Sequence, residues 1–308
     1  MCYGPIGIGF CLQSKLLLTQ WMANTMSTTF GAGFHVAPGK AVDASAYERW
    51  TGRWSRLFIP AVLAAAAVGP KCRILDVSTG TGEAARMALP LVGTEGIVVG
   101  ADISSAMLRS ARAELDRSSF LPVAADGQAL PFRDASFDAL VCQLGLQFFP
   151  DPARGVGEFR RVLRKGGKVA ICVISTPDRA PMWGNLADVV SRFLPELREV
   201  LFLSFALHDP NRLEAMLVDA GFRDVHVERT TRADSFESFA DYWEPIEVGV
   251  GSIPQSYLRM FAGILKGSST DWRRHRRLRC GRDQVAGARY RCPIQRGLHG
   301  ATWPRLQK

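Results

Sequence analysis

The chain has 308 residues, 47% of them hydrophobic and 22% charged, which is ordinary for a folded protein with one large domain. No apolar run approaches the roughly 18 residues of a membrane span, and the N-terminal stretch lacks the features of a signal peptide. Residues 267–308 hold 11 basic and 2 acidic residues, whereas residues 1–266 hold 27 of each, so the tail carries the whole net charge of +9. Nucleic acid is therefore an unlikely partner of the body of the protein and is expected, if anywhere, at the tail.

The seven cysteines are widely scattered and form no CxxC pair. This arrangement predicts neither a disulfide framework nor a metal site, and it fits a reducing cytoplasm.

Residues 1–40 show no sustained period and are expected to be poorly ordered. From 44 to 68, apolar residues recur at helical spacing and predict one or two amphipathic helices. Apolar strands then alternate with helices, which predicts an α/β fold with a doubly wound, mostly parallel sheet covered on both faces. The strands are expected at 72–77, 96–102, 120–126, 137–145 and 168–175, and the helices at 83–92 (ending near Pro90), 105–115 (capped by Ser104) and 153–167 (stopped by Gly166–Gly167).

After the fifth strand, residues 177–207 are irregular, helical and rich in Trp, Phe and Leu, which predicts a helical cap insertion over a substrate. A helix over 212–222, a sixth strand over 224–230 and a helical region over 235–265 follow. Residues 267–308 show neither the helical nor the strand period.

A glycine loop, Gly80-Thr81-Gly82, joins the first strand to its helix. Glycines allow a tight turn and a close backbone approach to a ligand, and the first loop of such a sheet lies at the topological switch point. Alone, the loop fits a nucleotide-type ligand or a structural turn.

Two carboxylates end the next strands. Asp102 lies twenty residues after Gly82, where it is expected to accept the ribose hydroxyls of a nucleotide, or alternatively to favour a helix N-terminus. Asp126 ends the third strand and is suited to an adenine amino group or to an Asx turn. Met107, on the helix after Asp102, is a candidate to pack on adenine or in the core.

Five segments resemble, in this order, the motifs of class I S-adenosylmethionine-dependent methyltransferases, in the group of ubiquinone/menaquinone C-methyltransferases. They are ILDVSTGTGE, GADISSAML, ADGQALPF, SFDALVCQLGLQFFPD and RVLRKGGKVAI. The resemblance covers roughly residues 47–227 and implies a Rossmann-like methyltransferase fold with S-adenosylmethionine as cofactor. It assigns the methionine part to Asp76 and the Gly80–Gly82 loop, the ribose to Asp102, the adenine edge to Asp126 and Gly127, and the sulfonium to Gln143. Ile103, next to Asp102, and Met107 are also expected to contact the cofactor.

Ser78 departs from this pattern, because the group has glycine there, and serine disfavours the left-handed backbone. A slightly remodelled loop is therefore expected. Residues 47–58 resemble the group's N-terminal lid helix, whose Tyr47 and Arg53 are candidates for the cofactor carboxylate or for solvated positions. His208 is a weak candidate for a catalytic base.

The patterns along the chain predict a methyltransferase domain over 41–266, with a lid helix at 44–68, a cofactor-binding core at 72–175, a cap at 177–207 and the remaining core at 210–266. The sequence predicts methyl transfer to a small, partly hydrophobic acceptor by C- or O-methylation. The turn Cys142-Gln143-Leu144-Gly145 lacks the Asn/Asp-Pro-Pro-aromatic motif, which disfavours methylation of amino groups on DNA bases. No oligomeric state is predicted.

Three alternatives stay open. One is a non-catalytic S-adenosylmethionine-binding protein, and another is a nucleic-acid methyltransferase steered by the tail. The third is an NAD(P)-dependent oxidoreductase, since Gly80-x-Gly82-x-x-Ala85 fits the dinucleotide fingerprint. The charge of Asp76 and the absence of a Tyr-x-x-x-Lys pair disfavour it.

Methyltransferases of this fold normally end with an antiparallel strand between the fifth and sixth strands, and no such strand is evident after Lys266. The tail is interpreted as a disordered basic segment, as a non-native terminus such as a shifted reading frame, or as an ordinary ordered end. The second interpretation predicts a missing last strand, a poorly anchored sixth strand and association through the open sheet edge.

Overall fold

The computed structural model describes residues 44–115, 119–249, 251–267 and 290–291. Its central sheet has five parallel strands in the order β3-β2-β1-β4-β5. Neighbouring β1 and β4 lie where the strand order reverses, so the carboxyl ends of these two strands form the switch point of the sheet. The strands are β1 (Arg73–Val77), β2 (Ile97–Asp102), β3 (Phe120–Ala124), β4 (Phe137–Gln143) and β5 (Leu163–Cys172).

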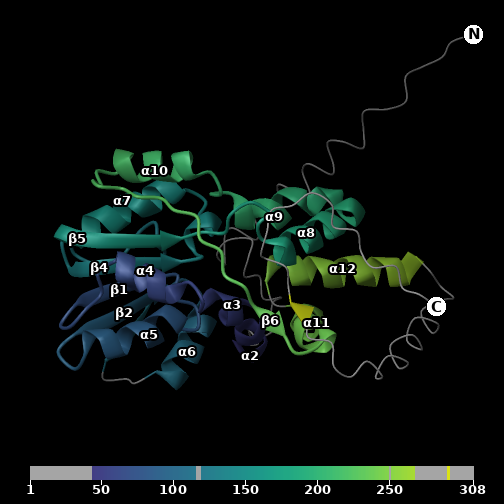
Figure 1. Cartoon of the computed structure of the whole chain (residues 1–308), viewed down its shortest axis with the longest axis horizontal. Helices are drawn as coiled ribbons and strands as arrows, with labels where there is room; N and C mark the ends of the chain where they lie inside the picture. The colour runs from purple at the N-terminus through teal and green to yellow at the C-terminus, as the bar shows by residue number, and fades with distance from the viewer. Residues whose placement is uncertain (1–43, 116–118, 250, 268–289, 292–308) are drawn as a thin grey trace, which may run out of the picture.

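Helices cover both faces of the sheet, which confirms the predicted doubly wound fold (Figure 1). On one face α4 (Ile59–Ala65), α5 (Glu83–Val92) and α6 (Ser105–Glu114) pack on side chains such as Ile74 and Val98. On the other face α7 (Pro152–Val162) and α10 (Pro210–Asp219) pack on Leu75 and Leu140. Strands buried on both faces explain the near-continuous apolar runs of the sequence.

The helix α5 spans Glu83–Val92, the predicted segment, and ends two residues after Pro90, which is exposed. One predicted helix end needs correction. The helix α7 ends at Val162, five residues before its predicted end, because Leu163 already pairs with Phe137 of β4. The glycines expected to stop α7 instead lie inside β5, where the register with β4 shifts. Ser104 caps α6 as predicted, accepting a hydrogen bond from the Met107 amide at 3.4 Å.

The predicted sixth strand over 224–230 does not form. This segment is mostly exposed, and only Val225 and Val227 pack against the core. Its distance from the sheet is the physical reason, because a groove lined by both elements separates it from β5. Within the described residues, β5 is therefore an edge strand of the sheet.

A short strand pair lies outside the sheet. The strand β6 (Ser235–Phe236) pairs antiparallel with β7 (Tyr290–Arg291), so two tail residues are in a strand although none was predicted there. Residues 1–40 and the rest of the tail lie outside the described residues. Expectations about their order are therefore untested.

A third cluster of apolar side chains joins helices beside the carboxyl end of the sheet, including Trp50, Trp183 and Ile246. The predicted lid is broken into α2, η1, α3 and α4, with Pro60 at the start of α4. No helix in the described part of the chain is long and apolar enough to cross a membrane. The remaining elements around this cluster are α2 (Ala44–Tyr47), η1 (Glu48–Gly52), α3 (Arg53–Ser55), α8 (Pro181–Phe193), η3 (Pro195–Leu197), α9 (Arg198–Phe202), η4 (Leu203–Phe205), α11 (Phe239–Val248) and α12 (Ser252–Gly267), and η2 (Leu146–Phe148) follows β4.

Candidate functional site

The loop after β1 turns through left-handed backbone at three positions, with φ values of 60° at Ser78, 56° at Gly80 and 87° at Gly82. A Cβ on Gly82 would lie 2.8 Å from Leu115, so both the conformation and the space there require glycine. Ser78 takes the left-handed conformation despite its side chain. Such a conformation costs a non-glycine residue about 1–2 kcal/mol. The expected remodelling of the loop relative to the group stays a prediction.

Asp102 lies against this loop, as the sequence predicts for a shared site. The Gly80 amide donates to Asp102 Oδ2 at 2.9 Å, and the Ser104 amide donates to Oδ1 at 2.8 Å. Burial raises the pKa of Asp102, while these amide bonds oppose the rise. Ile103, which lies between Asp102 and Ser104 in the sequence, is half-buried.

Asp76 is a buried carboxylate beneath the loop, with 1% of its surface exposed. Thr79 Oγ1 donates to Asp76 Oδ2 at 2.6 Å, whereas Oδ1 is buried without a hydrogen-bond partner among the described residues. Burial raises the pKa of Asp76 to about 7; the Asp102 charge adds to the rise and the Thr79 bond opposes it.

The two lid candidates lie in different places. Tyr47 is half-buried, and a Cβ on Gly80 would lie 3.9 Å from its hydroxyl oxygen. Burial raises the Tyr47 pKa, and the charge of Asp102 adds to the rise. Tyr47 is therefore at the loop, as predicted.

Arg53 is turned away from the loop. Its guanidinium pairs with Asp234 at 2.9 Å and with Asp241 at 2.8 Å, and it lies 4.5 Å over the Phe236 ring. These partners are more than 180 residues away in sequence, so the sequence could not indicate them. With its donors engaged there, Arg53 does not support the carboxylate-binding role predicted for it.

A charged cluster that the sequence analysis missed lies between lid and loop. Thr81 donates to Glu48, and Arg56 lies 3.5 Å from Glu48 and 3.4 Å from Glu83. Burial raises the pKa of Glu83 to about 7, and the neighbouring Glu48 carboxylate adds to the rise. One sequence signal was available, because Glu83 follows the glycine loop directly and Arg56 lies two turns after Glu48.

The side-chain oxygen of Gln143 also lacks a hydrogen-bond partner among the described residues. Gln143 Nε2 donates to the Ser55 carbonyl at 3.3 Å, and its Oε1 is buried and unpaired among the described residues. Together with Asp76 Oδ1, this gives two buried oxygens at the switch point that lack donors. Unpaired buried acceptors are costly, so they favour a ligand that brings N–H groups or positive charge.

The loop after β3 brings Asp126 and Gly127 to the same edge of the sheet. Asp126 Oδ1 accepts the Gln128 amide at 2.7 Å, which is the Asx-type turn considered from the sequence. A Cβ on Gly127 would lie 2.3 Å from the Phe149 ring, so only glycine fits. Met107 is buried, with 2% of its surface exposed.

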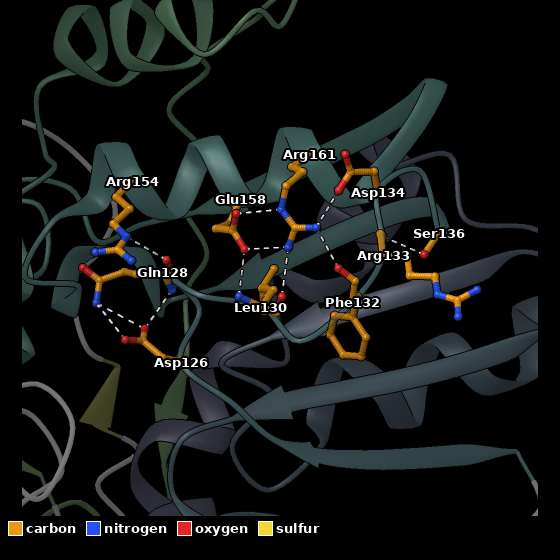
Figure 2. A network of polar contacts seen from close by, with 10 residues as sticks. All are labelled: Asp126, Gln128, Leu130, Phe132, Arg133, Asp134, Ser136, Arg154, Glu158 and Arg161. Atoms are coloured by element: carbon orange, nitrogen blue, oxygen red, sulfur yellow. Dashed lines mark hydrogen bonds and ion pairs between the residues drawn. The ribbon is translucent and has the colours of Figure 1, made fainter.

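Arg161 of α7 is hydrogen-bonded to the loop after β3 (Figure 2). Its guanidinium donates to the carbonyls of Leu130 at 2.9 Å and Phe132 at 2.7 Å, and pairs with Asp134 at 2.8 Å and Glu158 at 2.7 Å. Glu158 in turn accepts the Leu130 amide at 2.8 Å. The bond from Arg161 holds the pKa of Glu158 below its usual range, so both partners stay charged.

A large, mostly apolar cavity of about 1300 Å³ opens beside the carboxyl ends of β4 and β5. Trp54, Trp183 and Ser175 line it there, and the two indole nitrogens and the Ser175 hydroxyl are buried without a hydrogen-bond partner among the described residues. His208 also lines the cavity; it is exposed, and its Nδ1 lies 2.7 Å from the Phe205 carbonyl. A carbonyl only accepts, so Nδ1 carries the proton in this arrangement.

Comparison with known proteins identifies the family of the chain. A family model for a methyltransferase domain matches residues 75–171. The ubiquinone/menaquinone biosynthesis C-methyltransferase of Shewanella frigidimarina is 34% identical over 176 residues, covering 52% of this chain and 70% of that protein. The enzyme of the same description from Coxiella burnetii is 35% identical over 167 residues, covering 49% and 67%.

Among solved structures, an arsenic(III) S-adenosylmethionine methyltransferase from Chlamydomonas reinhardtii is 24% identical, with a TM-score of 0.43 over 60% of this chain and 69% of that chain. The curated relatives and the family model define the class: the protein is an S-adenosylmethionine-dependent methyltransferase. Within this class, the chain belongs to the family of the ubiquinone/menaquinone C-methyltransferases.

Proposed function

We propose that the cofactor is held by the residues gathered around the glycine loop. Asp102 and Ile103 hold the ribose, Asp126, Gly127 and Met107 surround the adenine, and Asp76 with Gln143 faces the methionine part. Tyr47 closes the site from the lid, and the other loop residues of this set are Ser78, Gly80 and Gly82. The unpaired oxygens of Asp76 and Gln143 support this proposal, because the cofactor carries a sulfonium and an ammonium group.

Arg56 replaces Arg53 in this proposal as the lid cation for the cofactor carboxylate. It lies beside Glu48 and Glu83 at the glycine loop, and 44% of its side chain is exposed. A guanidinium suits a carboxylate because it donates two parallel hydrogen bonds.

We further propose that the acceptor is small and partly hydrophobic and is methylated on carbon or oxygen. The observation that carries this proposal is the apolar cavity, which is lined by Leu144, the residue after Gln143, and by Trp54, the residue before Ser55, whose carbonyl binds Gln143. The start of α8, which lines the cavity with Pro181, Met182 and Trp183, would act as its cap. The unpaired indole N–H groups of Trp54 and Trp183 are donors for oxygen atoms of such an acceptor.

When bound, the cofactor supplies an electrophilic methyl group, and the protein contributes orientation and a dry site. Trp183 and Trp54 position the acceptor by packing and by their N–H groups. His208 stays the candidate base: with Nδ1 bonded to the Phe205 carbonyl, Nε2 is left to accept a proton. Free cysteines at 72, 142 and 172 fit a cytoplasmic enzyme.

Formation of S-adenosylhomocysteine over a panel of phenols, quinols and aliphatic acids tests the proposal. With the best acceptor, Trp183→Phe keeps an aromatic ring but removes the N–H group, so KM should rise about tenfold while the cofactor Kd stays unchanged. Turnover of none of these acceptors, or an unchanged KM in Trp183→Phe, would contradict the assignment of this cavity. A variant at exposed Phe193, Phe193→Leu, serves as the control outside the cavity.

A further inference from the structure

Two glutamates meet where the lid contacts the glycine loop. Glu48 lies in η1 of the lid, and Glu83 begins α5 directly after the loop. Thr81 of the loop donates a hydrogen bond to Glu48 Oε1. The other oxygen of Glu48, Oε2, is buried, as is Glu83 Oε2, and neither accepts a hydrogen bond from a described residue. Because unpaired buried acceptors are costly, a hydrogen-bond donor is needed at this contact.

Arg56 lies close to both of these oxygens but does not satisfy them. Its Nη2 is 3.5 Å from Glu48 Oε2, and its Nε is 3.4 Å from Glu83 Oε2. The single proton of Nε is directed at the Gly52 carbonyl, 3.0 Å away, and Nη2 donates to the backbone carbonyl of Glu48 at 3.4 Å. Arg56 therefore places a positive charge beside both carboxyl groups and gives a hydrogen bond to neither.

One proton shared between the two carboxyl groups supplies the donor. A protonated carboxyl group donates a hydrogen bond that a carboxylate accepts, so a single proton satisfies both oxygens. Burial raises the pKa of Glu83 to about 7, and the charge of Glu48 and a hydrogen bond to its side chain add to the rise. The pair therefore keeps its proton up to about neutral pH, whereas a glutamate in water ionises near about pH 4.3.

The other charged groups around the pair do not replace this proton. Arg86 of α5 lies 3.5 Å from Glu83 Oε1, the opposite oxygen of that carboxyl group, and it also pairs with Glu114 of α6 at 2.8 Å. Burial and the nearby carboxylates, Asp102 first among them, raise the pKa of Tyr47 of α2, so its hydroxyl stays uncharged. Once the shared proton leaves, two carboxylates face each other across the contact between lid and loop.

We propose that Glu48 and Glu83 share one proton in the free protein, and that this hydrogen bond holds the lid against the glycine loop until the proton leaves. The lid carries Tyr47, which closes the proposed cofactor site, so the two glutamates act as positioning residues that control entry of the cofactor. Control of entry rests on the proposed cofactor site, whereas the shared proton belongs to the free protein. Gly52 leaves room for the pair, because a Cβ there would lie 2.4 Å from Glu48 Oε2.

Hydrogen exchange of the full-length protein without cofactor tests the shared proton. The closed lid binds the proton and the open lid does not, so closing is favoured at low pH. Protection over 44–58, corrected for the intrinsic exchange rate, should fall about tenfold from about pH 6 to about pH 8. Glu48→Gln donates to Glu83 without titrating, so its protection should stay high at both pH values. Glu48→Ala should show low protection at both.

A glycine substitution breaks the contact without removing either acid. Gly52 has ordinary helical backbone, with φ −60° and ψ −40°, so alanine fits the backbone and displaces only the Glu48 carboxyl group. Gly52→Ala should therefore behave as Glu48→Ala does. Glu95→Gln is the control, since exposed Glu95 pairs with Lys71 at the opposite end of β1 from the loop, and it should behave as the wild type. A wild-type lid without the pH step, or a step that persists in Glu48→Gln, would refute the shared proton.

Stopped-flow binding of S-adenosylmethionine tests control of entry. The association rate should rise about tenfold over the same pH range in the wild type, and it should be slow at both pH values in Glu48→Gln and fast at both in Glu48→Ala. The cofactor's own amino group titrates near about pH 8, so variants are compared at equal pH. Equal rates in all three proteins would overturn the control of entry. Absence of cofactor binding would instead contradict the proposed cofactor site, and hydrogen exchange would still decide on the shared proton.

Discussion

Asp102→Ala is the sharpest test of the proposed cofactor site. The substitution removes the only charge that the proposal assigns to the two ribose hydroxyls. Hydrogen bonds to charged groups contribute about 1.5–3 kcal/mol, so the affinity for S-adenosylmethionine should fall about ten- to hundredfold. Isothermal titration with the cofactor and with S-adenosylhomocysteine measures this loss for both ligands.

The structure adds a stability effect that must be separated from binding. Asp102 also accepts the Gly80 and Ser104 amides, so its removal leaves two donors unpaired and lowers the melting temperature. Asp209→Ala is the matched control, since Asp209 accepts the Asn211 amide at the start of α10, away from the loop, and its loss costs about 1 kcal/mol. The control should lose stability without losing affinity. An unchanged cofactor Kd in Asp102→Ala would refute the assignment of the ribose to Asp102.

Three further results are expected. The pKa of Asp76 is about 7 in the folded protein and about 4 in the unfolded chain. The free energy of unfolding in urea should therefore fall as the pH rises from about 4 to about 7, and Asp76→Asn should flatten this slope. Arg161→Met leaves the Leu130 and Phe132 carbonyls without their donor, and the free energy of unfolding should fall by about 1–3 kcal/mol, with faster hydrogen exchange over 126–136; no change in either would contradict the clamp. A Cβ on Gly145 would lie 2.4 Å from that of Ser78, so Gly145→Ala should destabilise the protein, and Ser78→Gly should relieve part of the loss; additive effects in this double-mutant cycle would exclude the contact.

The sequence predicted the sheet and the site well where the signals are local. Apolar runs located all five strands, and the glycine loop with Asp102 was placed correctly because parallel strands end at one edge of the sheet. The predictions failed where a distant partner decides the outcome. Leu163 is a good helix residue, yet it pairs with Phe137 and begins a strand. Segment 224–230 alternates like a strand but has no neighbouring strand within bonding distance.

Dependence on distant partners also explains which part of the lid prediction failed. Helical spacing located residues 44–65, and Tyr47 reaches the loop as expected. Helical spacing could not indicate which arginine lies at the glycine loop, because the choice depends on Asp234 and Asp241 far along the chain. Arg53 binds those acids, whereas Arg56, three residues later, pairs with Glu48 and Glu83.

Three buried or half-buried acids lie at the glycine loop, and only Glu83 among them has an ion pair with an arginine of the described chain. Burial raises the pKa of Asp76 and of Glu83 to about 7 each and also raises that of Asp102, so near neutral pH each of them opposes folding when charged. In the proposed site, a ligand carrying a sulfonium and an ammonium favours the charged forms, lowers these pKa values and releases protons as it binds. The neutral product lacks the sulfonium charge and recovers less of this energy. If the proposed site is correct, the same buried carboxylates that make the free protein less stable would favour binding of the cofactor over binding of its product.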